Sequence, residues 1–190
     1  ARSVHAFLSS FDDHEIRNDW VSDIDNWKLN LDVNDPQAAP PEVFMLKKQA
    51  AMQAWYEHMP VRKALLPRGG MVAMNREFRY GDLMAMQLLD TRQYRSDQPC
   101  DDGFKPACPG VFDKSTQVLG KAQEEWLGRN LAKGGATWNA FAQQITMMSL
   151  DRRRKAEEPK KIVNLDSWAA YEAPRERILS RMRGSRTMSC

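Results

Sequence analysis

The stretch Phe11-Asp12-Asp13-His14-Glu15-Ile16-Arg17-Asn18-Asp19-Trp20 places three carboxylates and an imidazole in four consecutive residues. Carboxylates this close repel one another unless a cation or a proton lies between them, which indicates a site for a hard metal ion. The histidine adds a group that titrates near neutral pH. A second interpretation stays open, in which Asp12 or Asp13 caps a following helix and Glu15 lies in its first turn.

The residues on either side of this stretch predict alternating strands and helices. Residues 4–11 form a short apolar run that predicts a buried strand, with Asp12 at its carboxyl end, the edge where α/β proteins place active sites. Residues 21–41 contain three prolines and predict a surface loop. Apolar residues then recur at helical spacing up to Pro60 and predict an amphipathic helix over 43–59 with these residues inward. They are Phe44, Leu46, Ala50, Ala54, Trp55 and Met59.

The rest of the chain continues the same alternation. Residues 77–83 and 84–89 predict two strands that meet near Gly81-Asp82, as in a hairpin. The pattern as a whole predicts the α/β class, with a mixed sheet flanked by helices. The remaining expected elements are a helix over 120–133 that ends at Gly134-Gly135, a strand over 138–145, a charged loop over 151–161 and a helix over 167–183.

Two arginines follow the second strand of the expected hairpin. In the run Asp90-Thr91-Arg92-Gln93-Tyr94-Arg95 the apolar strand gives way abruptly to charge. Arg92 and Arg95 are therefore candidates for binding a phosphate group. An equally open alternative is that each arginine forms an ion pair with Asp90 or Asp97 and only fixes the loop.

The three cysteines offer one pairing. Cys100 and Cys108 flank a short polar loop, and in an oxidising compartment a disulfide between them would close a small ring. The alternative is that both thiols are free, and Cys190 is left over in either case.

Composition excludes several classes of protein. With 190 residues, 42% hydrophobic residues and a mean hydropathy of -0.64, the chain is neither fibrous nor disordered. A net charge of +3 is too small to indicate a nucleic-acid partner, although the basic run 152–161 leaves that alternative to a test of salt-dependent binding. No apolar stretch is long enough to span a bilayer, and the first residues show no export signal.

Taken together and in order, six motifs resemble the landmarks of the PhoD-type alkaline phosphatases, relatives of the calcineurin-like metallophosphoesterases. The resemblance covers nearly the whole chain. The motifs are Asp12-Asp13-His14-Glu15, the segment 55–62 (Trp-Tyr-Glu-His-Met-Pro-Val-Arg), the segment 78–83 (Phe-Arg-Tyr-Gly-Asp-Leu), the segment 89–95, the segment 123–127 and Asp166-Ser167-Trp168.

This resemblance implies a periplasmic or secreted hydrolase that cleaves phosphate monoesters and diesters and uses iron and calcium. Carried over residue by residue, it implies that Asp13 is a metal ligand and that His14 contacts the phosphate and assists the leaving group. Asp12 is a weaker candidate for a ligand. His58, on the expected long helix, is interpreted as structural.

The chain also departs from the family pattern. The family's first metal ligands precede the Asp-Asp-His-Glu motif, and its later Gly-Asp-x-His motif does not follow Gly184 here. We therefore expect residues 1–184 to be the central part of a metallophosphatase sandwich that is incomplete at both ends, and residues 185–190 to be a divergent tail. The isolated chain is expected to have little or no activity. The alternative is a catalytically dead remnant or an interaction module that retains the scaffold.

Overall fold

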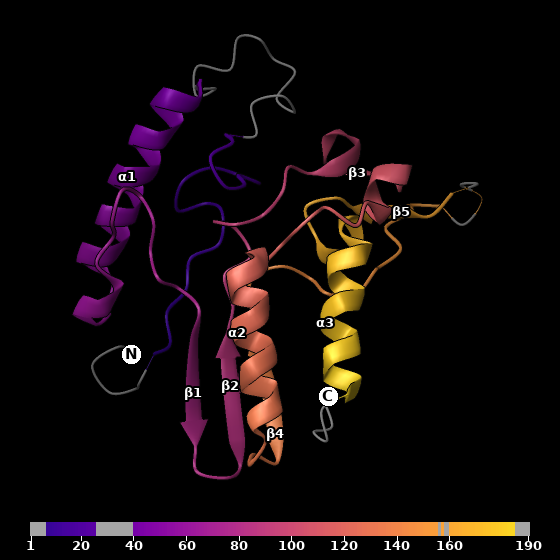
Figure 1. The fold of residues 1–190 in the computed structure, drawn as a ribbon. Coiled ribbons are helices and arrows are strands. Elements are labelled where there is room, and N and C mark those ends of the chain that lie inside the picture. The colour runs from indigo at the N-terminus through magenta and orange to yellow at the C-terminus, as the bar shows by residue number, and fades with distance from the viewer. Residues whose placement is uncertain (1–6, 26–39, 156, 158–159, 185–190) are drawn as a thin grey trace.

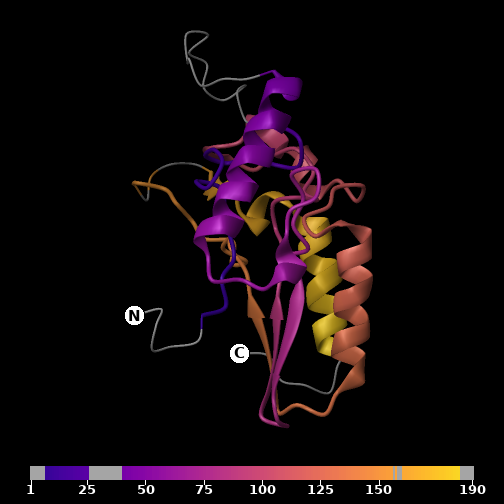
Figure 2. The ribbon, with the colours of Figure 1, turned by 90° about the vertical axis from the view of Figure 1, so that its left-hand side faces the viewer.

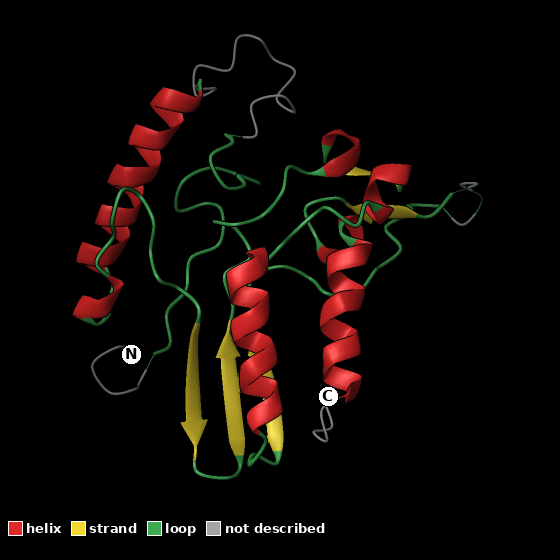
Figure 3. Ribbon diagram, viewed as in Figure 1, coloured by secondary structure: helices red, strands yellow, loops and turns green. Residues whose placement is uncertain are grey.

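The computed structural model of the protein describes residues 7–25, 40–155, 157 and 160–184, and the account below is confined to them. Within this part the fold is mixed α/β, with a mixed sheet and helices, as the sequence predicts (Figure 3). Three of the expectations fall wholly or largely outside the described residues: the start of the strand over 4–11, most of the loop over 21–41, and the tail over 185–190 with Cys190.

Helix α1 (Pro41–His58) confirms the amphipathic helix predicted before Pro60. Its inward face differs from expectation, because Leu46, Ala50 and Ala54 are exposed whereas the cationic Lys48 is fully buried. Lys48 is accommodated because its Nζ donates to the Ser22 carbonyl oxygen at 2.7 Å and lies 5.0 Å from the centre of the Trp20 ring. The buried residues of α1 are Phe44, Lys48, Met52 and Trp55.

The larger sheet has the order β1-β2-β4. Strands β1 (Arg76–Tyr80) and β2 (Met84–Leu88) form the predicted hairpin, antiparallel, with Phe78 opposite Met86. Gly81 turns the chain between them in the left-handed region, at φ +57°. Strand β4 (Trp138–Ala142) lies parallel to β2, so the carboxyl ends of these two strands meet at one edge of the sheet.

Helices α2 (Gly120–Lys133) and α3 (Glu172–Gly184) lie side by side, with α2 over the sheet (Figures 1 and 2). The helix expected over 167–183 is divided into a 3₁₀ turn and α3. A second, two-stranded sheet pairs β3 (Phe104–Pro106) with β5 (Ile162–Asn164), antiparallel. The 3₁₀ helices are η1 (Lys63–Leu65), η2 (Pro99–Asp101), η3 (Pro109–Phe112) and η4 (Trp168–Ala170).

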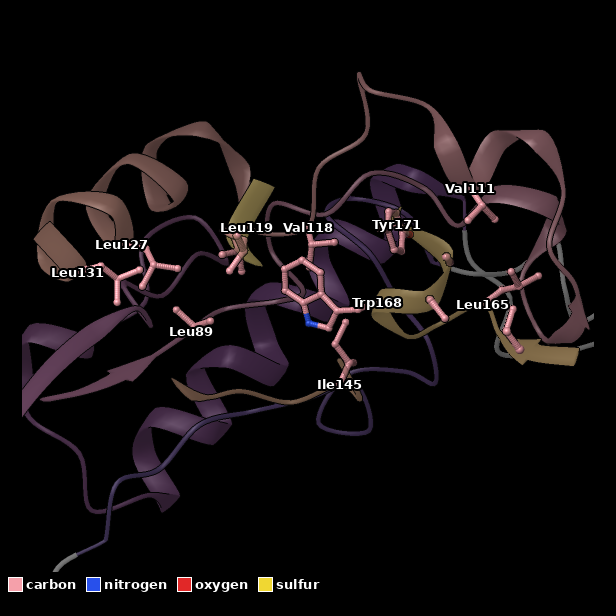
Figure 4. Close-up of a cluster of buried hydrophobic side chains, with 14 residues drawn as sticks. Leu89, Val111, Val118, Leu119, Leu127, Leu131, Ile145, Leu165, Trp168 and Tyr171 are labelled. Carbon is pink, nitrogen blue, oxygen red and sulfur yellow. The ribbon is translucent and has the colours of Figure 1, made fainter. Parts of the chain in front are cut away.

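The buried apolar side chains form two clusters. One lies among η3, α2, β5, η4 and α3 and is centred on Trp168, which Val118, Ile145 and Tyr171 surround in Figure 4. The other joins the amino-terminal segment to α1, η1 and the β1–β2 hairpin. Its members are Phe11, Trp20, Phe44, Met52, Trp55, Leu65, Val72, Met74 and Leu88.

The strand predicted over residues 4–11 is wrong for its described part, because residues 7–11 have no strand assignment. The apolar run was interpreted as a buried strand, but a strand needs a neighbour to bind its backbone groups. Here the described residues pair no strand with this segment. The Ser9 carbonyl oxygen instead accepts a hydrogen bond from the Arg76 guanidinium at 2.8 Å.

Candidate active-site turn and its arginine network

The carboxylate cluster lies in a turn closed by its own backbone. The Asp13 carbonyl oxygen accepts hydrogen bonds from the amides of Ile16 and Arg17 at 2.9 and 2.8 Å. Glu15 reaches back to accept the Asp12 amide at 2.9 Å. The helix-cap interpretation is wrong, because these residues form a turn without a following helix and the Asp13 carboxylate binds the Asp19 amide at 3.0 Å instead.

Buried aromatic residues hold both ends of this turn. Phe11 and Trp20 are 1% and 0% exposed, and their ring centres lie 6.3 Å apart. Phe11 also meets Trp55 of α1 edge-on at 5.8 Å. The indole N–H of Trp20 donates to the Asp12 carbonyl oxygen at 3.2 Å, so the hydrophobic cluster directly fixes the backbone that carries the carboxylates.

His14 projects from the turn into solvent. Its side chain is 79% exposed, and its Nε2 lies 4.0 Å from Asp13 Oδ2. Nε2 also lies 3.1 Å from Asn18 Oδ1, within hydrogen-bonding distance. The site therefore presents an accessible imidazole beside a carboxylate that is itself buried.

Two buried arginines connect the turn to the far end of the chain. Arg92 Nε donates to Asp12 Oδ1 at 2.8 Å, and its two terminal nitrogens donate to the two carboxylate oxygens of Asp166, each at 2.8 Å. Arg95 binds the same Asp166 carboxylate and also donates to the Asp166 carbonyl oxygen at 3.0 Å. We call Asp12, Asp13, Arg92, Arg95 and Asp166 the arginine network.

The two guanidinium groups of the network lie beside its carboxylates, so opposite charges are paired within the interior. Burial alone would raise the pKa of Asp166, but Arg95 and Arg92 outweigh burial and hold that pKa below its usual value. In Arg92, burial lowers the pKa, and the carboxylates of Asp166 and Asp12 outweigh it and raise the pKa. Both partners of this pair are therefore charged at neutral pH.

Two other aspartates at the turn have raised pKa values. Burial is the main cause for Asp12, and Arg92 opposes it. The pKa of Asp19 rises to about 7, first because of burial and then because of the negative charges of Asp166 and Asp102. Gln98 joins these groups by donating to the Asp19 carbonyl oxygen at 2.7 Å and to Asp166 Oδ1 at 3.1 Å.

The sheet places the arginines. They follow β2, at the edge where β2 and the parallel β4 both end. Gln144, beyond the end of β4, accepts hydrogen bonds from the Thr91 amide at 3.1 Å and the Thr91 hydroxyl at 2.7 Å. Gln123 of α2 accepts the Asp90 amide at 2.8 Å, so the segment that carries the arginines is bound from two sides.

The structure distinguishes some of the alternatives left by the sequence. The ion-pair interpretation of Arg92 and Arg95 was wrong about the partner, which is Asp166 rather than Asp90 or Asp97. Direct phosphate binding by the two arginines stays a prediction, and a phosphate would have to displace these carboxylates.

Cys100 and Cys108 are joined in a disulfide with a Cα–Cα distance of 5.9 Å.

Sequence reasoning missed three residues of this site. Asp166 was noted only as part of a family motif, although it is the main partner of both arginines. Asp19 and Gln98 were not singled out. The close spacing of acidic residues pointed to Asp19, whereas no local signal pointed to Gln98.

The described residues do not by themselves fit a metal centre. Among them there is no group of three or more His, Cys, Asp or Glu side chains placed to hold a metal ion. Asp12 and Asp13 supply two neighbouring carboxylates, but one oxygen of each already accepts a hydrogen bond, from Arg92 and from the Asp19 amide.

No described helix is long and apolar enough to cross a membrane.

Comparison with known proteins gives consistent matches. The family model described as PhoD-like phosphatase matches residues 1–189. Alkaline phosphatase D of Bacillus subtilis (strain 168) is 37% identical over 180 residues, which are 95% of this chain and 29% of that protein. A solved structure titled "Structure of PhoD" matches with a TM-score of 0.82 and 37% identity over 94% of this chain and 32% of the other. The chain thus spans less than a third of either relative. It belongs to the PhoD-like phosphatase family.

Proposed function

We propose that the residues described here belong to a metal-dependent hydrolase of phosphate monoesters or diesters, with His14 as its general acid. Family membership supports phosphoester hydrolysis. The observation that carries the assignment of His14 is its exposure, because its imidazole is an accessible proton donor on a turn whose backbone and Asp12 carboxylate are held by buried partners.

The proposed chemistry of His14 is a proton transfer. Water forms a new bond to phosphorus as the bond between phosphorus and the leaving oxygen breaks, and a protonated ring nitrogen of His14 donates its proton to that oxygen, which leaves as an alcohol. Asn18 and Asp13 restrict the position of the ring, so the donor does not have to be ordered in each turnover.

For the metal site, we propose Asp13, with Asp12 as the weaker candidate, as donors to a centre whose other ligands lie outside the described residues. Iron and calcium are the metals that the family resemblance suggests. A metal centre would neutralise negative charge on the phosphate oxygens. With two carboxylates available, we expect the isolated chain to bind metal weakly and to hydrolyse phosphate esters slowly or not at all.

A metal titration of the isolated chain tests this last expectation. Calorimetry with calcium and with iron should give weak binding, and the chain should not hydrolyse p-nitrophenyl phosphate above background. Tight binding, together with hydrolysis that His14→Ala abolishes, would show that the chain alone forms a competent site.

We further propose that the protein works in the periplasm or outside the cell. The Cys100–Cys108 disulfide supports this location, since such bonds persist in oxidising compartments. Cell fractionation with an antibody against the chain tests the proposal, and recovery of the protein with reduced cysteines in the cytosolic fraction would contradict it.

A chimera tests the proposed function in a complete enzyme. Residues 1–190 replace the matching segment of the Bacillus subtilis alkaline phosphatase D, and hydrolysis of p-nitrophenyl phosphate and bis(p-nitrophenyl) phosphate is measured. We expect activity, and we expect His14→Ala to lower kcat by about 100-fold or more, the usual contribution of a general acid.

The matched control is His58→Ala. His58 lies on α1, where its Nδ1 is 2.9 Å from the Ala54 carbonyl oxygen, away from the turn. This variant should keep the activity of the chimera. A folded chimera without activity would contradict the proposed function, and an active chimera that His14→Ala leaves unchanged would contradict the role of His14.

A further inference from the structure

The guanidinium group of Arg92 contacts the candidate active-site turn at three points. Arg92 binds Asp12 through Nε at 2.8 Å, lies 3.8 Å from Asp13 Oδ2 through a terminal nitrogen, and is 3.5 Å from the Trp20 carbonyl oxygen. Arg92 is 1% exposed, so these contacts are shielded from water. A planar guanidinium has a rigid set of donors, and fixing its plane fixes the direction of all its contacts.

We propose that Arg92, held in its plane by Asp166, is a positioning residue that sets the orientation of the Asp12–His14 turn. This inference rests on the proposed function of that turn. Asp166 is well suited to the task because it binds both terminal nitrogens of Arg92. It is itself held by the Asn164 side chain, which accepts the Asp166 amide at 3.0 Å, and by Arg95.

The electrostatics of the turn show why such a residue is needed. Asp12 and Asp13 are adjacent, and Asp166, bound to the same guanidinium as Asp12, adds a third negative charge. Arg92 is the cation that binds or approaches all of these carboxylates. Without it their repulsion favours a turn that opens toward solvent and carries His14 with it.

The role differs from the phosphate contact predicted from the sequence. A residue that binds substrate has donors free to face it, and its loss mainly raises KM. In Arg92, Nε and both terminal nitrogens donate to protein carboxylates, so its loss should disorder the turn and mainly lower kcat.

Hydrogen exchange of the 190-residue chain tests the proposal without any activity. Two N–H groups report on the turn: the Trp20 indole, bound to the Asp12 carbonyl oxygen, and the Asp19 amide, bound to Asp13 Oδ2. The variants are Arg92→Lys, which keeps a buried cation but lacks the planar guanidinium with its several donors, and Asp166→Asn, which is nearly isosteric. We expect protection of both reporters to fall about tenfold, as for one lost hydrogen bond, while the amides of α2 keep theirs.

The control variant removes an arginine that binds a carboxylate elsewhere in the chain. Arg177 of α3 binds both carboxylate oxygens of Glu124 at 2.9 and 3.1 Å, outside the network. Arg177→Ala should destabilise the chain and leave both reporters unchanged. In Arg92→Ala, added guanidinium chloride at millimolar concentration should restore the protection of both reporters, since it supplies the missing group.

The outcomes separate a positioning role from a general structural one. If Arg92→Lys and Asp166→Asn lower the melting temperature but leave both reporters as protected as in Arg177→Ala, the proposal is wrong. In the chimera, Arg92→Lys should lower kcat at least about tenfold with KM nearly unchanged, whereas a raised KM at constant kcat would indicate substrate binding. An inactive chimera would contradict the proposed function, while the exchange result would still decide the position of the turn.

Discussion

Replacing Asp166 by alanine should be one of the most destabilising single changes in the chain. Asp166 is the shared partner of Arg92 and Arg95, both at most 1% exposed. Its removal leaves Arg92 with the half-exposed Asp12 and leaves Arg95 with a backbone carbonyl and the Tyr171 ring at 5.4 Å. Breaking one buried ion pair by removing a partner costs about 3–5 kcal/mol.

Because two guanidinium groups lose their partner at once, we expect a loss near the upper end, about 5 kcal/mol. For a chain of this length such a loss lowers the melting temperature by about 10–20 °C. Urea unfolding followed by tryptophan fluorescence measures it, since Trp20 and Trp168 are fully buried and report on both hydrophobic clusters.

The control is Glu176→Ala, which removes the exposed partner of Arg183 on α3. An exposed pair of this kind contributes little, so no measurable change is expected. The reasoning on the buried network is refuted if Asp166→Ala costs about 1 kcal/mol or less, because the arginines would then be as well solvated as surface charges.

Three further predictions concern pH, the disulfide and one glycine. The pKa of Asp19 is raised to about 7 in the folded protein, whereas in the unfolded chain the carboxyl group loses its proton near pH 3.8. The free energy of unfolding therefore falls as the pH rises from about 4 to 7. Asp19→Asn should raise the melting temperature at pH 8 more than at pH 5. The disulfide between Cys100 and Cys108, eight residues apart, limits the conformations of the unfolded chain. Replacing both cysteines by alanine should therefore cost about 2–3 kcal/mol in urea unfolding relative to the disulfide-bonded protein, and an unchanged midpoint would contradict this. Gly120→Ala should destabilise by more than about 1 kcal/mol, because φ is +72° and a Cβ would lie 2.9 Å from Tyr94 Cβ; a calorimetric loss below that would show that the backbone adapts.

The sequence predicted the helices and strands whose signals lie within a few residues of one another along the chain. Helix α1, the β1–β2 hairpin and α2 were found at nearly their observed bounds, because helical spacing, Pro60 and the Gly81 turn are local signals. The strand over 4–11 failed for the opposite reason. An apolar run specifies burial, but the partner that makes it a strand lies elsewhere in the chain or is absent from the described residues.

The candidate site was predicted unevenly for the same reason. The carboxylates and the imidazole stand together in the sequence, and the family motif marked them. The partner of the arginines was not predictable from spacing, since Asp166 lies 74 residues beyond Arg92. The burial of Lys48 was not predicted either, since its partners, the Ser22 carbonyl oxygen, Asp23 Oδ1 at 3.5 Å and the Trp20 ring, lie in another segment of the chain.

The span of the arginine network along the chain bears on the order of folding. Arg92 joins a carboxylate 80 residues before it to one 74 residues after it, so both loops must close before its charge is compensated. Such distant contacts form late, since chain entropy opposes each closure. During synthesis the hairpin and α2 can assemble while the turn still lacks its far partner. The acidic turn is therefore expected to be among the last regions to reach its native arrangement, after the ribosome has released the segment that carries Asp166.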